Sequence, residues 1–355
     1  MNQGLVEQIA RAVLYEGYIL YPYRPSVKNR QRWTFGGLVP RAYSDAQGGS
    51  EPWEMQTECL VVGGPGTILS VSVRFLRLVA RLVGQFSIPQ EDWPAEGAVS
   101  CPIVELLQVG DEVLYTWQEA VEQSIDLGDS SLADLAVQTQ RREFMLEPER
   151  DRQPLRDRAG MFAGAVVRER RCVRGVVELG AVEVAPGVFR ATVKIQNQTS
   201  LEDGAAASRD EALMQGMVST HTVLSVREGE FVSMIDPPES YREQAALCRN
   251  VGCWPVLVGN AGDKDTILSA PIILYDYPQI APESPGELFD GTEIDEILTL
   301  RIMTLTDDEK VAMAAVDARA RAVLARTESL KNEQMLGLHG TFRGLQPFLG
   351  DRNHG

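Results

Sequence analysis

Residues Gly252–Lys310 read GCWPVLVGNAGDKDTILSAPIILYDYPQIAPESPGELFDGTEIDEILTLRIMTLTDDEK, and we expect the rest of the chain to pack against this stretch. Its segment Ile267–Leu274 is almost continuously apolar, which is typical of a short strand that is covered on both faces. Pro271 lies within that segment and has no backbone N–H. The strand is therefore expected at a sheet edge or at a bulge.

The second part of this stretch contains an acidic segment with prolines, followed by a segment in which apolar and polar residues alternate. Seven carboxylates and three prolines lie between Asp276 and Glu296, without any lysine or arginine. Prolines stiffen the backbone and remove hydrogen-bond donors, so this acidic segment is expected to cross the surface in an extended form. Residues Ile297–Leu305 then alternate between apolar and polar side chains, which predicts a strand.

Helices are predicted at both ends of the chain. Apolar residues recur every four positions from Leu5 to Val13, and this first helix is expected to end near Glu16. Thr306 and Glu309 have the spacing of a capping box, in which each side chain bonds the backbone of the other residue. A long helix is therefore expected from Asp307 to about Leu330.

Alternating apolar and polar residues predict strands over much of the remaining chain. The clearest case is Phe189–Asn197, and Leu69–Phe75 shows the same pattern before the apolar phase changes, which indicates a bulge or a bend in a long strand. Residues Thr222–Val226 and Phe231–Ile235 are expected to form a hairpin, whereas Cys101–Ile125 has helical spacing. Short strand pairs of this kind favour an α+β fold, mainly an antiparallel β-sandwich with flanking N-terminal and C-terminal helices.

The composition divides the chain into four parts. Residues 1–125 are expected to form a β-rich half with helices, and residues 166–335 a sandwich half with the long helix. The intervening residues 126–165 are rich in arginine and acidic residues and are interrupted by prolines, which predicts a charged linker or an exposed excursion. Residues 336–355 form a glycine-rich tail.

Overall charge limits the classes of partner. The chain has 355 residues with 34 basic and 50 acidic side chains, so its formal net charge is −16. Such a charge repels the phosphates of nucleic acids and anionic lipids, and neither is expected as a partner. No apolar run reaches the roughly 18 residues that a membrane helix needs, and the N-terminus does not resemble a signal peptide. We therefore expect a cytoplasmic protein without membrane insertion.

Candidates for chemistry are few. Of the three histidines, His339 and His354 lie in the tail, which leaves His221 at the start of a predicted strand, where a structural role is favoured. Cys248 and Cys253 are a weak candidate metal pair, because a structural zinc site needs a second pair or histidines. The five cysteines are an odd number, so no disulfide framework is expected. We assign no catalytic residue and expect no cofactor.

The charge distribution offers a candidate partner-binding surface. Four cations lie close together in residues 24–32 of an otherwise acidic protein, and they have two interpretations. They pair with the acidic segment of the same chain, or they contact an anionic surface of a partner or an anionic ligand. The residues assigned to partner binding are Arg24, Lys28, Arg30, Arg32, Trp33, Tyr277, Glu283, Glu287, Asp290, Glu293 and Asp295.

Four phrases of the sequence carry a resemblance to a known family: residues 16–49, residues 53–60 (WEMQTECL), residues 252–259 (GCWPVLVG) and residues 269–310. On these phrases the chain resembles the uncharacterised proteins encoded beside [NiFe]-hydrogenases of aerobic hydrogen-oxidising bacteria. The resemblance implies an accessory role in assembling, scaffolding or docking a large hydrogenase, or in delivering something to it. It supplies no catalytic residue.

These observations favour a non-catalytic accessory protein whose partners are hydrogenase subunits or their accessory proteins. Two alternatives stay open. One is a metal-dependent or small-molecule enzyme that uses His221, the cysteine pair or the clustered carboxylates. The other is a ligand-binding module with a cleft between the two halves. Its predicted lining is Tyr21, Tyr23, Trp33, Tyr275 and Tyr277.

Overall fold

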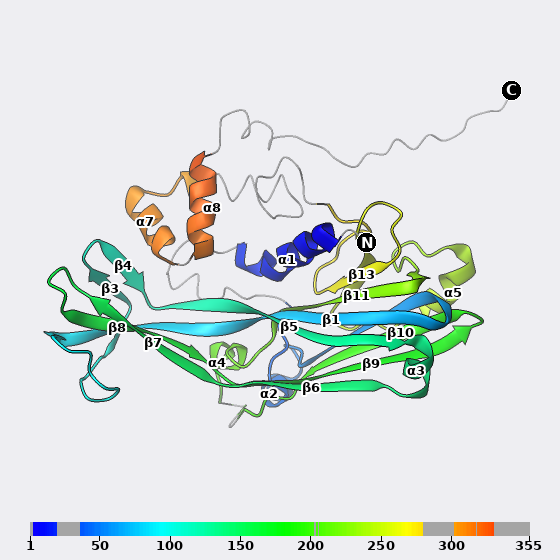
Figure 1. Cartoon of the computed structure of the whole chain (residues 1–355), viewed down its shortest axis with the longest axis horizontal. Coiled ribbons are helices and arrows are strands. Elements are labelled where there is room, and N and C mark those ends of the chain that lie inside the picture. The colour runs from blue at the N-terminus through cyan, green and yellow to red at the C-terminus, as the bar shows by residue number, and fades with distance from the viewer. Residues whose placement is uncertain are drawn as a thin grey trace.

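The computed structural model describes residues 3–19, 36–201, 204, 206–279, 302–316 and 318–329. Over these residues the protein is mainly antiparallel sheet with helices packed around it (Figure 1), which confirms the predicted α+β class. The strands are β1 (Glu54–Gln90), β2 (Ile103–Val104), β3 (Leu106–Val109), β4 (Glu112–Tyr115), β5 (Trp117–Ser131), β6 (Gln140–Leu146), β7 (Glu149–Arg156), β8 (Phe162–Arg170), β9 (Val173–Ala185), β10 (Val188–Asn197), β11 (Val218–Phe231), β12 (Trp254–Leu257) and β13 (Thr266–Ala270). The helices are α1 (Gln3–Ile19), α2 (Arg41–Ala46), α3 (Leu132–Val137), α4 (Arg209–Leu213), the 3₁₀ helix η2 (Glu239–Tyr241), α5 (Arg242–Ala246), α7 (Asp307–Val316) and α8 (Ala318–Ser329).

Strand β1 is the element around which the sheet is organised. Eleven strands form one sheet, whose main path runs β12-β13-β11-β1-β10-β9-β6, while β2, β5 and β8 also pair with β1. The register of β1 shifts at Gly63, where a Cβ atom would meet the Thr67 hydroxyl at 2.2 Å, so only glycine fits this close approach. A second shift lies between Arg74 and Leu76. The extra residue at this shift lies in β11, where Ser219 has a left-handed φ of 53°, and β1 pairs with β5 without a shift from Ser72 to Arg81. The predicted bulge in β1 is therefore wrong: the apolar phase changes because Phe75 faces the main core, whereas Leu76 and Leu78 face a separate small core.

The pairings give the sheet two layers that face one another. One layer contains β6, β9, β10 and the start of β1, and the other contains β12, β13, β11, β5 and the middle of β1. Apolar side chains from both layers form the largest core, which includes Phe75, Leu179, Ile195 and Leu224. Burial alternates along β10 as the sequence predicts, because successive side chains of a strand point to opposite faces.

Helices cover the outer faces of this sandwich. Ile9 and Val13 of α1 pack against apolar side chains of β12 and β13, and α2 and α4 form a separate small core with Leu76. Helices α7 and α8 lie side by side (Figure 1), and the buried side chains of Met313 and Leu324 belong to one small apolar core. The predicted flanking helices are thus present at both ends of the described chain.

The C-terminal helix differs from the prediction in one respect. Its capping box is confirmed, because the Thr306 N–H donates to the Glu309 carboxylate at 2.9 Å and the Glu309 N–H donates to the Thr306 hydroxyl at 3.3 Å. The predicted single helix is instead two helices that pack on each other. Of the strand predicted over Ile297–Leu305, residues 302–303 are helical, and residues 297–301 lie outside the described residues.

Two further element predictions are wrong. Residues Cys101–Ile125 contain β2, β3, β4 and most of β5 instead of a helix. Strand β5 pairs with β1 from Arg81 to Ile68, and this long pairing overrides the helical spacing of its apolar residues. The predicted hairpin around Glu228 is also absent, because β11 runs without interruption to Phe231 and Glu228 takes a left-handed φ of 58° within it.

The charged segment 126–165 consists largely of strands. It contains the end of β5, α3, β6, β7 and the start of β8, and all these strands belong to the large sheet. In the described part of the chain, β6 pairs only with β9 and β7 only with β8, so both are edge strands. Edge strands commonly carry charges and proline, which block pairing with other chains. The composition that suggests a linker is therefore that of a protected sheet edge.

Strands continue beyond the sandwich into a separate extension, which we call the arm. The arm consists of β1 from Ala80 onward together with β2, β3, β4, β7 and β8. It occupies one end of the molecule, opposite α3 and α5 (Figure 1). Val83, Leu107, Leu155 and Val166 form its own small core. Residues 336–355, predicted as a tail, lie outside the described residues.

Candidate interaction surface

Most residues assigned to partner binding from the sequence lie outside the described residues; only Tyr277 is placed. Its backbone N–H donates to the Leu257 carbonyl at 2.7 Å, and its side chain packs against the sandwich core. Asp276 beside it accepts the Leu257 N–H at 2.8 Å. Residues 276–277 thus cover part of the outer edge of β12, and burial raises the pKa of Tyr277.

His221 lies on β11, beneath α1, and is fully buried. Its Nδ1 donates to the Ser219 carbonyl oxygen at 3.0 Å, while Nε2 has no hydrogen-bond partner among the described residues. Burial lowers the pKa of the ring to about 4, so the imidazole is neutral near pH 7. No nucleophile or carboxylate of the described chain is hydrogen-bonded to it. The environment is that of a structural histidine.

An ion pair beside His221 holds α1 on the sheet. Both guanidinium nitrogens of Arg74 donate to the two carboxylate oxygens of Glu7 at 2.7 Å. A bidentate pair of this kind has fixed geometry as well as charge attraction, and the hydrogen bond from Arg74 lowers the pKa of Glu7. On the same helix, the Val13 carbonyl accepts the Ser219 hydroxyl at 3.1 Å. These polar contacts orient α1 over its apolar contacts with β12 and β13.

The thiols of Cys248 and Cys253 are engaged in packing. Cys253 is 2% exposed, and its Sγ donates to the Gln56 carbonyl at 3.0 Å and lies 3.2 Å from the Thr57 hydroxyl. Burial raises the pKa of Cys253 and raises that of Cys248 to about 11, so both thiols stay protonated at neutral pH. Among the described residues no three histidine, cysteine or carboxylate side chains form a group that could hold a metal ion.

The loop between these cysteines covers the start of β1. Gln56 forms an antiparallel bridge with Val251, and the Glu58 N–H donates to the Asn250 side chain at 2.8 Å. The Glu58 carboxylate in turn accepts the Arg249 N–H at 2.7 Å. Strand β11 pairs with β1 only from Val61 onward. Before that point, the loop supplies hydrogen-bond partners for the backbone of β1 on this side.

Two buried arginines join the arm to the sandwich. Arg77 is 2% exposed and donates to the carbonyl oxygens of Glu147 and Arg171, the latter at 2.8 Å. Arg81 is 5% exposed and donates to the Tyr115 carbonyl and to the Glu119 carboxylate, each at 3.1 Å. A buried guanidinium is tolerated only with such partners, so these contacts fix β6, β7 and β4 around one strand.

The arm carries a surface whose composition is typical of protein interfaces. The Arg152 and Arg156 guanidinium groups lie 4.8 Å and 3.8 Å from the ring centres of Trp93 and Phe162, and these two rings are 5.3 Å apart. Ile88 is 72% exposed, and Ile103 and Leu106 are each 51% exposed. We use the name arm surface for the outside of the arm, and on it we single out Ile88, Trp93, Ile103, Leu106, Arg152 and Arg156.

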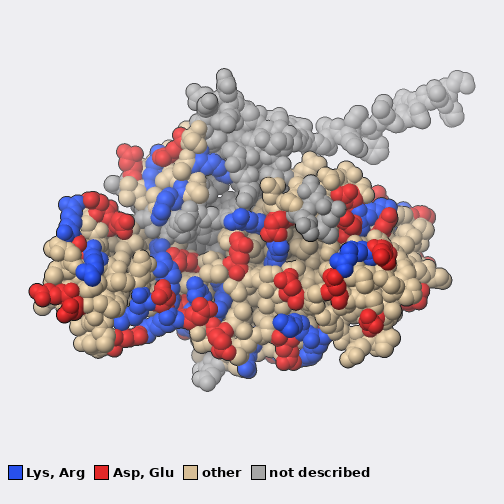
Figure 2. Space-filling view, in the orientation of Figure 1, with Lys and Arg blue, Asp and Glu red and all other residues tan. Residues whose placement is uncertain are grey.

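Charged side chains of both signs surround this surface. Basic and acidic residues intermingle where β7 and β8 lie (Figure 2), and several are paired, as in the contact of Arg150 with Glu169 at 3.0 Å. Tryptophan and arginine are enriched at the centres of interfaces, and paired charges form their rims. The sequence pattern does not single out these residues, because the segments that carry them are far apart in the chain and are brought together only by strand pairing.

Comparison of the chain with models of known protein families and with curated protein sequences gives no match. Within the described residues, no helix has the length and apolar character needed to cross a membrane.

Proposed function

We propose that this chain is a non-catalytic accessory protein that acts by scaffolding or docking through protein–protein contacts in a [NiFe]-hydrogenase system. The arm surface is the observation that supports this most directly, because it exposes aliphatic and arginine side chains beside the partly buried Trp93 on a firmly anchored element. The resemblance at residues 16–49 and 269–310 supplies the hydrogenase context. Hydrogenase subunits or their accessory proteins are the proposed partners.

The roles of the reactive side chains are consistent with this proposal. His221 donates to a backbone carbonyl beneath α1, and Cys253 bridges β1 to the neighbouring loop. His221 is therefore a buried group bonded within β11, and Cys253 joins two elements. Their burial holds the imidazole neutral and the thiol protonated.

The arm surface has enough apolar area to contribute to binding. Full burial of one exposed isoleucine side chain contributes roughly 1.5–3 kcal/mol, so Ile88 and Ile103 are substantial contributors when covered. The cationic segment 24–32 and the acidic segment 276–296 are proposed as a second, electrostatic contact. Charge complementarity increases the association rate and makes it sensitive to salt.

A pull-down with purified hydrogenase subunits tests the proposal. Association is expected at low ionic strength with the unaltered chain, and the double variant Ile88→Asp, Ile103→Asp is expected to lose it. Val137→Asp is the matched control, because Val137 is 90% exposed on α3, at the opposite end of the molecule (Figure 1). Circular dichroism of each variant verifies folding. Failure to recover any subunit, or equal recovery with the double variant, would contradict the proposal.

A further inference from the structure

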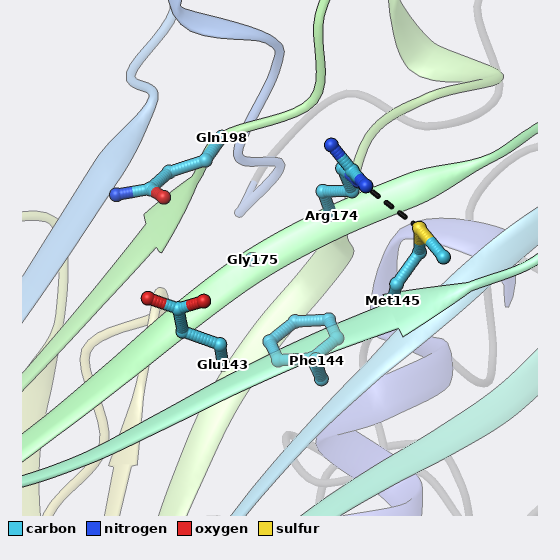
Figure 3. A pocket seen from close by; sticks show the side chains of 6 residues that line it. All are labelled: Glu143, Phe144, Met145, Arg174, Gly175 and Gln198. Carbon is cyan, nitrogen blue, oxygen red and sulfur yellow. Dashed lines mark hydrogen bonds between the residues drawn. The ribbon is translucent and has the colours of Figure 1, made fainter.

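A surface pocket of about 350 Å³ lies over β6 and β9, away from the arm surface. Its lining residues are Glu143, Phe144, Met145, Arg174, Gly175 and Gln198 (Figure 3). Strand β6 ends the strand order of the sheet, so the pocket opens beside a sheet edge. The volume is at the lower end of the range of ligand pockets, roughly 300–1,000 Å³, and is suited to a single residue or a small molecule.

Glycine at position 175 is needed to form the base of the pocket. A Cβ atom there would meet Phe144 Cζ at 2.3 Å and the Gln196 carbonyl oxygen at 3.1 Å. The Phe144 ring packs against the strand at this glycine and continues into the core, where its centre lies 6.0 Å from that of Phe75. The base of the pocket is thus rigid.

Arg174 is the cation of this pocket, and its backbone is fixed. Its N–H donates to the Thr199 hydroxyl at 2.9 Å, and its carbonyl accepts the Gln198 N–H at 2.9 Å. Its guanidinium Nε points to the Met145 sulfur at 3.0 Å (Figure 3), which is a weak acceptor. Among the described residues no carboxylate pairs with Arg174, whereas Arg141 on the adjacent strand contacts both Glu143 and Glu178.

The other walls supply an acceptor and an apolar contact. Glu143 accepts from Arg141 through Oε1 only, so its second oxygen has no hydrogen-bond partner in the described chain. Met145 presents a flexible thioether that adapts to apolar groups. A guanidinium fork binds a carboxylate through two parallel hydrogen bonds, and a carboxylate such as that of Glu143 accepts from an amide N–H. One pocket therefore offers partners for a carboxylate, an amide N–H and an apolar side chain.

We propose that this pocket binds the C-terminal residue of a partner polypeptide. The terminal carboxylate pairs with Arg174, the N–H of the same residue donates to Glu143, and its side chain packs against Met145. The preceding residues of the partner leave along the open edge of β6. This inference rests on the proposed function, since it presumes a protein partner, and it concerns a surface separate from the arm.

The test uses N-acetyl-L-leucine as a probe of a C-terminal residue, N-acetyl-L-leucinamide as its uncharged counterpart and hexanoate as a carboxylate without an amide. Binding is followed by the amide NMR shifts of Gly175 and Gln198 in the full chain. N-acetyl-L-leucine is expected to bind at least about tenfold more tightly than either of the other probes, because a hydrogen bond to a charged group is worth at least that factor. Equal binding of the leucinamide or of hexanoate would overturn the proposal, as would unmoved Gly175 and Gln198 signals up to the solubility limit of the probe.

Variants separate the pocket from general charge effects. Arg174→Gln is expected to remove the preference for N-acetyl-L-leucine, and Arg174→Lys to keep part of it, because lysine supplies charge without the fork. Arg142→Gln removes an exposed cation from β6 outside the pocket and is expected to leave binding unchanged. If Arg142→Gln weakens binding as much as Arg174→Gln, the assignment to this pocket is wrong. Failure here leaves the arm pull-down unaffected, so the two proposals fail separately.

Discussion

Acidification is expected to destabilise the protein through His221, whose neutral ring is buried beneath α1. Burial lowers the pKa of this ring from 6.5 to about 4. The unfolded chain therefore takes up a proton near pH 6.5, whereas the folded protein does not bind it until about pH 4. The stabilising contribution is fully present above pH 6.5 and is lost as the pH falls toward 4. At about 1.4 kcal/mol per pH unit, the loss is about 3 kcal/mol.

Charged groups around His221 also titrate or act on it, so a comparison with a variant is needed. The charge of Arg74 lowers the pKa of His221 further, and the charge of Glu7 on α1 raises it. The pKa of Glu7 is itself lowered by its hydrogen bond to Arg74, so its contribution is lost when the pH falls through its folded value. The informative quantity is the difference in free energy of unfolding between the two proteins at each pH.

The variant His221→Asn keeps an amide N–H for the Ser219 carbonyl but has no group that titrates. Urea unfolding of both proteins between about pH 7.5 and pH 4 gives the two free energies of unfolding. The variant is expected to be less stable at neutral pH, because the smaller side chain leaves a cavity. This deficit is expected to shrink by about 3 kcal/mol toward pH 4. If the free energies of unfolding of the two proteins change in parallel over the whole pH range, the pH dependence does not come from His221.

Three other substitutions have defined expectations, each measured by urea unfolding. Thr222→Val removes a buried hydroxyl without a hydrogen-bond partner in the described chain, so it is expected to stabilise by about 1 kcal/mol without a pH dependence; destabilisation would show a missed partner. Arg77→Ala leaves buried carbonyls unpaired and is expected to cost about 3–5 kcal/mol and to expose the arm to proteolysis first, so an unchanged digestion pattern would contradict its anchoring role. Gly175→Ala is expected to cost about 1–3 kcal/mol, and addition of Phe144→Leu is expected to recover part of this; no recovery would locate the strain elsewhere.

The sandwich was predictable because its strands expose one face and bury the other. In β10 and in the middle of β1, inward and outward side chains differ in polarity, so the period of two is visible in the sequence. The phase change after Phe75 predicts a bulge in β1, but it instead marks the point at which both faces of β1 are covered, since Phe75 belongs to the main core and Leu76 to a separate one. The capping box at Thr306 depends on residues three apart, and it is formed as predicted.

The edge strands and the arm were not predictable from the same period. In β6, Arg141, Arg142 and Glu143 are exposed in succession, because a side chain at an open edge reaches water on either face. The alternation is therefore lost, and the charged composition resembles that of a linker. The candidate site was hidden for another reason. Trp93 and Arg152 meet only because β7 pairs with β8 and β8 pairs with the end of β1.

The buried arginines connect this fold to its proposed action. Arg77 and Arg81 occupy positions on β1 that continue the buried apolar face beyond Phe75, and apolar residues there would pack without directional bonds. Each guanidinium instead bonds carbonyl oxygens of other strands, so it fixes the direction in which the arm leaves the sandwich. A docking surface held in one orientation loses little conformational entropy on binding. The exposed residues of the arm are already arranged for contact. The smaller loss of conformational entropy on binding thus offsets the free-energy cost of desolvating two buried charges.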